Sequence, residues 1–323
     1  MRKALVVGLT EYENCPLDCC ANDAEVVAEL LERNEDGSKN FHVMCCKYQA
    51  TKGELNAQIS ELFKDPNDVA LLYFSGHGHV DGNKNSYLVT TDFNEFVYGV
   101  RLDDILHIVN VSPARNKIII LDSCFSGKMG TSNVFGNTQS LISEGTTILT
   151  SSRDYETSVA YDDHSLFTML LVEALKGGAA DILGNISLGS IYAYIDRALG
   201  AWQQRPLFKT NVSTFLSLRK ISPSVSSECI RKLIEYFPDA KSPIDLDPSF
   251  EDTNSPDVEH VVKEPYAEEG NVKIFKDLQK MESIGLVQPK DAEHMYFAAI
   301  NSKACQLTSL GRYYWKLAKE GKI

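Results

Sequence analysis

The chain has 323 residues, of which 43% are hydrophobic, which is enough for one sizeable core and a second, smaller unit. Its formal net charge of -12 at pH 7 argues against a protein whose main role is to coat nucleic acid or an anionic membrane, because both are bound chiefly through positive charge. No apolar run reaches the length of a membrane span and no signal peptide is recognisable, so we expect a cytoplasmic protein.

The cysteine pattern also bears on the compartment. The chain holds eight cysteines, including the vicinal pairs Cys19-Cys20 and Cys45-Cys46. With no export signal, reduced thiols are expected rather than disulfides. A zinc site built from Cys15 and these pairs is an alternative, although no CxxC spacing is present.

The first 220 residues alternate short apolar runs with segments of helical spacing. The predicted strands are 3–8, 41–46, 69–75, 117–122, 146–151 and 212–218. The predicted helices are 24–31 with an N-cap at Asn22, 54–64 with a capping box from Thr51, 101–109, 164–176, and a last one from the cap Ser187 to about 203.

This alternation predicts an α/β fold, a mostly parallel sheet with helices on both faces. The strands 69–75 and 117–122 are continuously apolar and end abruptly at small and polar residues. One is followed by His77 and the other by Cys124. Ligands of such sheets bind beyond the carboxyl ends of the strands, so we expect both side chains at the functional edge.

The composition changes near residue 222. Residues 222–269 carry 12 acidic and 4 basic side chains among scattered prolines, which predicts an acidic linker, with a helix over 228–236. Residues 270–323 carry 9 basic and 5 acidic side chains and predict a small α+β module. The expected domains are therefore 1–221, the linker 222–269, and 270–323.

His77 and Cys124 together indicate nucleophilic catalysis. A cysteine nucleophile needs a base to accept its proton and N–H donors where the carbonyl oxygen becomes negative. The glycines on both sides of His77 allow close backbone approach to a substrate and leave the Gly78 N–H free to donate. Taken singly, Cys124 reads as a buried thiol and His77 as a loop histidine, but packing does not explain two polar, glycine-bordered strand ends in one sheet.

The motifs YFSGHGH, ending at His79, and LDSCFSG, beginning at Leu121, resemble the histidine and cysteine blocks of the caspase-like cysteine peptidases, and among them the metacaspases and their prokaryotic relatives. The resemblance covers about residues 1–219. It implies that Cys124 is the nucleophile, that His77 is the general base and later the acid, and that the N–H groups of Gly78 and Cys124 form the oxyanion hole. It also suggests a role in bacterial immunity or cell death.

The same resemblance implies a preference for basic substrates. Asp122 precedes Cys124 by two residues as in metacaspases, and Cys20-Ala21-Asn22-Asp23 matches the family block that supplies a second acid. Two carboxylates would attract Arg or Lys, and Arg can form bidentate bonds. An acid such as Asp23 is also expected in a first helical turn for the helix dipole alone. Further substrate-binding candidates by resemblance are Ser75, Ser152 and Asp154.

Two regulatory features follow from the loops. Lys128 lies in a glycine- and serine-rich segment beside the nucleophile and is a candidate for self-cleavage. Many metacaspases need calcium held by an acidic cluster after the histidine. The short loop here offers only Asp81 and Asp92, so we expect no metal and no cofactor, and calcium activation is in doubt.

Residues 270–323 resemble a winged-helix unit, with a helix ending in SIGLVQ, a strand pair and a final helix over 310–319. Its excess of four positive charges is small for DNA binding, so we expect it to dock a regulatory protein partner, with no membrane contact and no nucleic acid. Two alternatives stay open: a catalytically silent caspase-like scaffold, and a winged-helix regulator that binds DNA.

Overall fold

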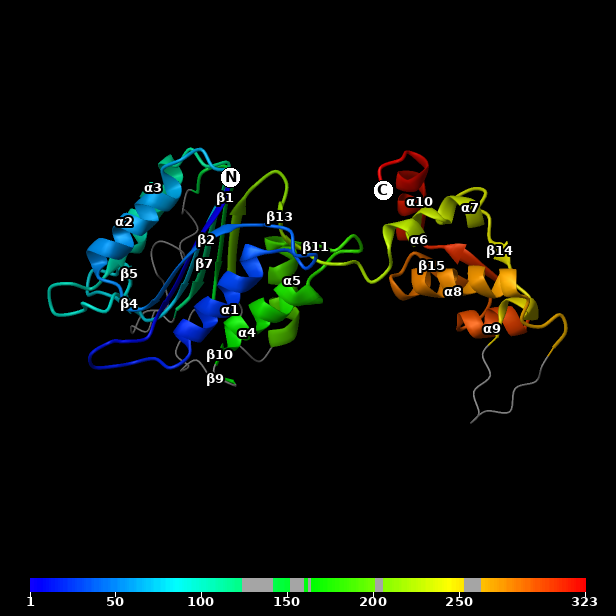
Figure 1. Cartoon of the computed structure of the whole chain (residues 1–323), viewed down its shortest axis with the longest axis horizontal. Helices are drawn as coiled ribbons and strands as arrows, with labels where there is room; N and C mark the ends of the chain where they lie inside the picture. Colours follow the sequence, from blue (N-terminus) through cyan, green and yellow to red (C-terminus); the bar gives the residue numbers. More distant parts are fainter. Residues whose placement is uncertain (124–141, 152–159, 162–163, 201–205, 253–262) are drawn as a thin grey trace. The chain divides into compact units, whose positions relative to one another are not determined.

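The computed structural model describes residues 1–123, 142–151, 160–161, 164–200, 206–252 and 263–323. The chain forms two compact units, Met1–Ser222 and Pro223–Ile323, which are described separately (Figure 1). In the described part of the chain, no helix has both the length and the apolar character that a membrane span requires.

The first unit is built on a six-stranded sheet in the order β12-β8-β7-β3-β1-β2. Its strands are β1 (Arg2–Leu9), β2 (His42–Tyr48), β3 (Val69–Ser75), β7 (Asn116–Asp122), β8 (Thr146–Thr150) and β12 (Leu207–Asn211). All neighbours are parallel except β12, which pairs antiparallel with β8. The predicted mostly parallel α/β sheet is confirmed. The predicted last strand over 212–218 is wrong, since β12 precedes that range and β13 (Ser217–Lys220) pairs with β11 (Asn185–Ser187) outside the sheet.

Helices cover both faces of this sheet (Figure 1). One face packs against α2 (Lys52–Phe63) and α3 (Leu102–Val111). The other face packs against α1 (Cys20–Glu32), α4 (Leu166–Glu173) with its continuation η1 (Ala174–Gly178), and α5 (Leu188–Leu199). Successive side chains of a strand point to opposite faces, so the fully buried β3 sends Leu72 and Phe74 to the first core and Leu71 and Tyr73 to the second.

Local capping signals place most helix starts correctly. Thr51 and Glu54 form the expected capping box of α2, and Ser187 caps α5. The predicted cap at Asn22 is wrong, because α1 begins at Cys20 and Asn22 lies inside its first turn. This start needs Gly8 of β1, where a Cβ would lie 2.0 Å from the Cys20 carbonyl oxygen.

A small antiparallel sheet follows the histidine. Its strands are β4 (Gly78–Val80), β5 (Ser86–Leu88) and β6 (Val100–Arg101). A second hairpin joins β9 (Ala160–Tyr161) to β10 (His164–Ser165), immediately before α4. Both hairpins lie next to the carboxyl ends of the central strands in sequence, so they extend the edge at which the predicted site residues gather.

The second unit contains a three-stranded antiparallel sheet, β14-β16-β15, and short helices. Its elements are α6 (Ser227–Arg231), α7 (Leu233–Tyr236), β14 (Ile244–Asp245), η2 (Pro248–Phe250), α8 (Glu269–Ser283), β15 (Val287–Lys290), α9 (Met295–Ile300), β16 (Ala304–Leu307) and α10 (Ser309–Lys319). The β15/β16 pair lies between the two longer helices in sequence, as expected, and α9 lies between its two strands. The winged-helix resemblance stays a prediction.

Residues 223–252 differ from the expected linker. Leu233 and Phe237 are fully buried, and the Trp315 indole Nε1–H donates to the Phe237 carbonyl at 2.8 Å. The buried Asp277 accepts hydrogen bonds from Lys232 at 2.7 Å and from the Tyr236 hydroxyl at 2.9 Å. The segment therefore packs within the second unit, because its apolar residues recur at helical spacing among the acids and prolines that suggested a linker.

Candidate active site

The two predicted site strands are parallel neighbours. Ser75 of β3 lies opposite Asp122 of β7, and the Gly76 N–H donates to the Asp122 carbonyl at 3.2 Å. In the sequence, His77 follows Ser75 by two residues and Cys124 follows Asp122 by two. β7 ends at Asp122, and Ser123 is the last described residue before Cys124, so the chain brings His77 to the edge of the sheet at which Cys124 follows. Four predicted site residues lie outside the described residues: Cys124, Lys128, Ser152 and Asp154.

The imidazole of His77 has a defined orientation. Its Nε2 lies 2.8 Å from the backbone carbonyl oxygen of Cys15, in the loop between β1 and α1. A carbonyl oxygen can only accept, so Nε2 carries the proton and Nδ1 of the neutral ring keeps its lone pair. The contact thus assigns the tautomer and leaves Nδ1 available as a base.

Tyr12 supports the same histidine. Its hydroxyl accepts a hydrogen bond from the His77 N–H at 3.2 Å and donates to the Val89 carbonyl at 3.2 Å. The Val89 N–H donates directly to the His77 carbonyl at 2.9 Å. In a regular antiparallel ladder, the His77 N–H would also donate directly to the Val89 carbonyl. Here the Tyr12 hydroxyl lies between these two groups and bonds to both. Its ring also meets the imidazole edge-on at 4.6 Å.

Gly76 and Gly78, on either side of His77, contribute to the site in different ways. A Cβ on Gly76 would lie 2.6 Å from the Tyr12 hydroxyl oxygen, so this position must be small to admit the phenol. Gly78 pairs with Leu88 of β5, one step along from the hydrogen-bonded pair at His77. Hydrogen-bonded and non-bonded pairs alternate in such a ladder, which directs the Gly78 N–H away from β5. The donor predicted for the oxyanion hole is therefore not used by this hairpin.

Asp23 lies fully buried in the first turn of α1. Its carboxylate accepts a hydrogen bond from Nδ1 of His164 at 2.8 Å, from the Ser75 hydroxyl at 3.3 Å and from the Ser165 N–H at 3.4 Å. Two of the predicted substrate residues, Asp23 and Ser75, are thus in direct contact.

Asp122 joins this cluster through the start of α4. Its carboxylate accepts hydrogen bonds from the Ser165 hydroxyl and from the Thr168 hydroxyl, the latter at 2.7 Å. Thr168 in turn accepts from the buried Tyr73 hydroxyl at 2.5 Å, because its own proton goes to Asp122. Ser165 is also the N-cap of α4 and uses its N–H for Asp23. One residue therefore links the two acids.

The electrostatics of the cluster favour a cation. Burial raises the pKa of Asp23 to about 6, opposed mainly by the hydrogen bond from His164, and the neighbouring Asp122 raises it further. Burial also raises the pKa of Asp122, while the hydroxyls of Ser165 and Thr168 oppose this. A positively charged ligand would lower both values, since it stabilises each carboxylate.

The sequence did not identify several of these contacts. His164, Ser165 and Thr168 lie in a segment predicted only as the beginning of a helix, whereas the structure places His164 in β10 and starts α4 at Leu166. The HSLFT motif at 164–168, with its serine cap, is the signal that was available. The contact of the Cys15 carbonyl with His77 could not be predicted from the sequence, because every residue has a backbone carbonyl.

No group of three or more histidine, cysteine or acidic side chains in the described part of the chain can hold a metal ion. The two acids considered for calcium are engaged locally. Asp81 accepts from Asn85 and Tyr87, and Asp92 accepts from Thr90 at 2.6 Å.

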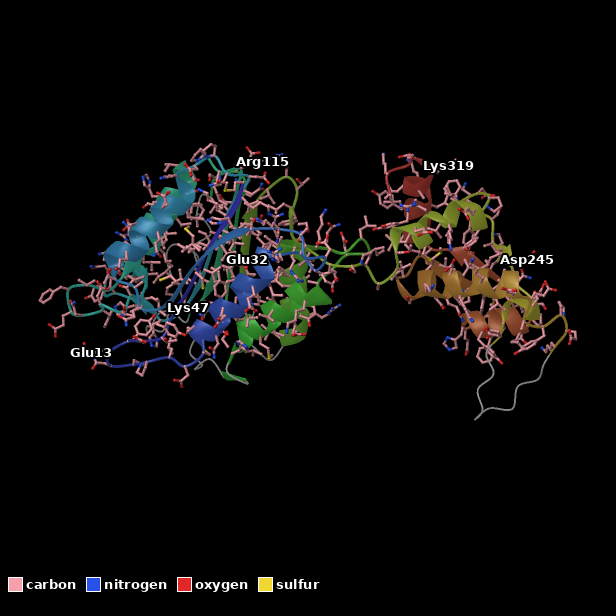
Figure 2. All side chains as sticks on the ribbon, in the orientation of Figure 1. Glu13, Glu32, Lys47, Arg115, Asp245 and Lys319 are labelled. Atoms are coloured by element: carbon pink, nitrogen blue, oxygen red, sulfur yellow. The ribbon has the colours of Figure 1, made fainter. Side chains whose placement is uncertain are left out.

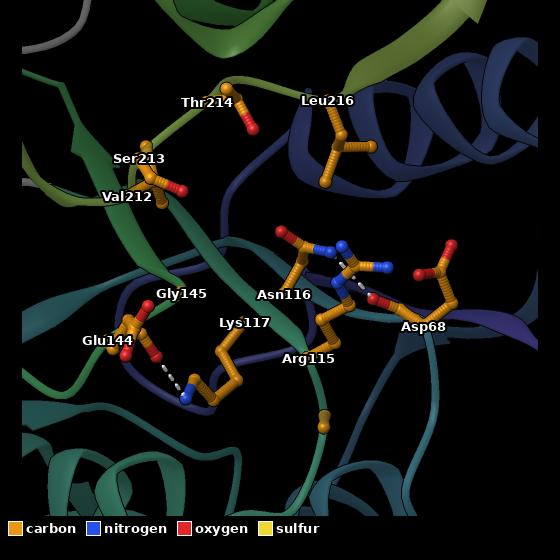
Figure 3. Close-up of a pocket in the computed structure, with 11 residues that line it drawn as sticks. Asp68, Arg115, Asn116, Lys117, Glu144, Gly145, Val212, Ser213, Thr214 and Leu216 are labelled. Carbon is orange, nitrogen blue, oxygen red and sulfur yellow. Dashed lines mark hydrogen bonds between the residues drawn. The ribbon is translucent and has the colours of Figure 1, made fainter.

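A cavity of about 460 Å³ lies at the opposite edge of the sheet (Figure 3). It is lined by the residues that begin β7 and precede β8, including Lys117 and Gly145, together with Val212, Ser213, Thr214 and Leu216. Figure 2 shows Arg115 at this edge and Glu13 and Lys47 at the other, where β1 and β2 end. This cavity is therefore separate from the cluster around Asp23.

Comparison with known proteins gives three findings. The family model of the caspase domain of the C14 peptidases matches residues 1–232. A search of curated proteins found no match. Among solved structures, a protein from Geobacter sulfurreducens is similar with a TM-score of 0.50 at 19% identity, over 69% of this chain and 98% of that chain, which bears on the fold alone. Caspase-1 from Spodoptera frugiperda has a TM-score of 0.49 at 13% identity, covering 68% and 92%.

Proposed function

Because the chain belongs to the caspase family of peptidases, family C14, we propose that it is a metacaspase-type cysteine endopeptidase that cleaves after Arg or Lys. Membership supports a cysteine peptidase, and the buried acids Asp23 and Asp122, joined through Ser165, support the basic specificity. This pair of acids is the observation that carries the proposal, since a cationic side chain would stabilise two desolvated carboxylates.

The chemistry is a two-step acyl transfer. The Cys124 thiol gives its proton to Nδ1 of His77, and the sulfur attacks the carbonyl carbon of the residue before the scissile bond. The N–H groups of Gly78 and Cys124 stabilise the negative oxygen. His77 then protonates the leaving amine, and water activated by His77 hydrolyses the thioester. The Cys15 carbonyl favours this cycle because it stabilises the imidazolium while holding the ring in place.

In the specificity pocket, Asp23 and Asp122 bind the guanidinium or ammonium group. Arg has five N–H donors in a planar fork and can bond both acids, whereas Lys offers one compact charge. We expect Ser75 to contribute through its contact with Asp23. We propose the same position in the pocket wall for Ser152 and Asp154, from the family pattern.

The state of the cysteines bears on the cellular setting. The cysteines in the described chain are free thiols, the usual state in a reducing compartment, and we keep the cytoplasm as the location. We propose that the enzyme serves bacterial immunity or cell death and that residues 270–323 dock a regulatory protein. The exposed Leu310 and Tyr313, on successive positions of one face of α10, support such docking.

The function is tested by digesting a peptide library with the purified full-length protein, with and without calcium, and identifying the cleaved bonds by mass spectrometry. We expect cleavage after Arg and Lys that requires Cys124 and persists when calcium is chelated. Cleavage confined to aspartyl bonds, or equal cleavage by the Cys124→Ala variant, would reject the proposal.

A further inference from the structure

His164 is a basic side chain bound directly to a buried acid of the cluster. Its Nδ1 lies 2.8 Å from Oδ1 of Asp23, in an ion-pair geometry. The Asp23 side chain is fully buried, whereas that of His164 is 28% exposed. The imidazole comes from β10 and the carboxylate from the start of α1, two elements in contact at one end of the unit (Figure 1). His164 is therefore partly exposed to solvent while it contacts the fully buried carboxylate of Asp23.

The other donors to Asp23 are neutral and more distant. The Ser75 hydroxyl and the Ser165 N–H lie 3.3 and 3.4 Å from its oxygens. His164 thus makes the shortest hydrogen bond to this carboxylate among the described residues. A hydrogen bond from a group that can be charged stabilises a buried carboxylate more than a neutral one does.

Among the described residues, the other titratable groups that interact with Asp23 all carry a negative charge when they ionise. They are Asp122 from β7, Tyr73 from β3, and the thiol of Cys19, the N-cap of α1. None of them can offset the charge of an ionised Asp23, and Asp122 opposes it. Within the described chain, His164 is therefore the group that can stabilise an ionised Asp23 when no substrate is bound.

We propose that His164 is a positioning residue for substrate specificity, which holds Asp23 as a carboxylate in the empty pocket and so sets the pH range in which an Arg or Lys side chain is accepted. This inference rests on the basic specificity proposed above. It assigns His164 no contact with the scissile bond, so the effect belongs to substrate binding rather than to the chemical step.

Loss of His164 would weaken the binding of basic substrates through Asp23. Burial already raises the pKa of Asp23 to about 6 with His164 present. Without the imidazole, the pKa rises further, and a neutral Asp23 would be populated near pH 7. A basic side chain would then meet one carboxylate instead of two, so KM rises at neutral pH and recovers as the pH is increased.

The test uses the full-length protein and peptides with Arg or Lys before the scissile bond, with kcat and KM measured from pH 5.5 to 8.5. Only an ionised Asp23 supplies the second carboxylate, so we expect His164→Ala to raise KM several-fold at pH 7, with kcat unchanged, and KM to recover near pH 8.5. His164→Gln, which keeps an N–H donor but no charge, should lie between. If His164→Ala does not fold, the kinetic constants of His164→Gln provide the test.

Controls separate this role from a general loss of structure. His107→Gln alters an exposed histidine of α3 and should leave both constants unchanged. Asp23→Asn should raise KM at every pH and remove the part of the pH dependence that is due to Asp23. A KM profile of His164→Ala that coincides with the wild type overturns the proposal, as does an increase that high pH does not reverse.

A second measurement distinguishes failure of the proposed function from failure of the pair. The free energy of unfolding is followed against pH in wild type and His164→Ala, without any peptide. If His164→Ala raises the pKa of Asp23, the free energy of unfolding keeps falling up to a higher pH than in the wild type. If that extension appears while arginyl and lysyl peptides are not cleaved, the ion pair stands and the specificity role is rejected. Coincident curves reject the pair itself.

Discussion

The hydroxyl of Tyr12 accepts a hydrogen bond from the backbone N–H of His77 at 3.2 Å, and passes it on to the Val89 carbonyl. The phenol thus completes the first rung of the β4/β5 hairpin. Together with the Cys15 carbonyl on Nε2, it fixes both the backbone and the ring of His77. Two residues of one loop, 12 and 15, therefore position the proposed base from the side of β1.

Tyr12→Phe should reduce turnover. The change leaves the His77 N–H and the buried Val89 carbonyl without their relay, at a cost of about 1–3 kcal/mol per buried group. We expect kcat to fall about tenfold with little change in KM, since a loosened base lies further from its reacting atom. Steady-state kinetics with Tyr313→Phe, a change at an exposed tyrosine, as control measures this. An unchanged kcat would show that the relay does not position His77.

Much of this site was predictable because its parts are local in sequence. The apolar runs ending at Ser75 and Asp122 identified adjacent strands, and the family motif supplied Asp23. His164 and Tyr12 were missed because each acts across 65 residues or more, through contacts that no periodicity records.

The errors have physical causes as well. Asn22 is a favourable cap by residue type, but Gly8 lets the helix start earlier against β1, with its N-cap at Cys19, three residues before Asn22. The segment 223–252 carries enough acid and proline to suggest a linker, yet Leu233 and Phe237 bury against the second unit. In both cases packing outweighed the local preference.

Thr168→Val tests the support of Asp122. Valine has a similar shape, but it removes a donor to Asp122 and leaves the buried Tyr73 hydroxyl unpaired. We expect the free energy of unfolding to fall by about 2–4 kcal/mol in denaturant titrations. Thr210→Val, at an exposed threonine paired with Thr147, is the matched control and should change it by less than about 1 kcal/mol. Equal effects of the two substitutions would contradict the assigned role.

Because Asp23 and Asp122 are buried, we expect the free energy of unfolding to fall as the pH rises. The pKa of Asp23 is about 6 in the folded chain against 3.8 as its ordinary value, so between these pH values the folded state binds more protons than the unfolded state. Stability from this group is complete below pH 4 and is lost by pH 6 to 7, by about 3 kcal/mol. Asp122 acts in the same direction.

Denaturant titrations from pH 4 to 7 measure this slope. Asp23→Asn removes one titrating group and should flatten the slope while leaving the part due to Asp122. Other carboxylates with lowered pKa values, such as Asp65 beside Lys3, act in the opposite direction, so the difference between the two proteins is the quantity to compare. A difference that does not change with pH would contradict the raised pKa of Asp23.

Self-cleavage after Lys128 is expected if the enzyme accepts its own loop. Lys128 lies four residues after Cys124, in a segment outside the described residues. Intact mass measurement of the incubated wild type should reveal fragments that end at residue 128, and Lys128→Gln should abolish that cut. The same fragments in Cys124→Ala would assign the cleavage to a contaminating protease.

The most direct measurement of the central claim is kcat/KM for two peptides that differ only in Arg or Asp before the scissile bond, with wild type, Cys124→Ala and the double variant Asp23→Asn/Asp122→Asn. We predict that wild type strongly prefers Arg, that Cys124→Ala cleaves neither peptide, and that the double variant loses most of its arginyl activity. Preference for the Asp peptide, or full arginyl activity in the double variant, would contradict the account.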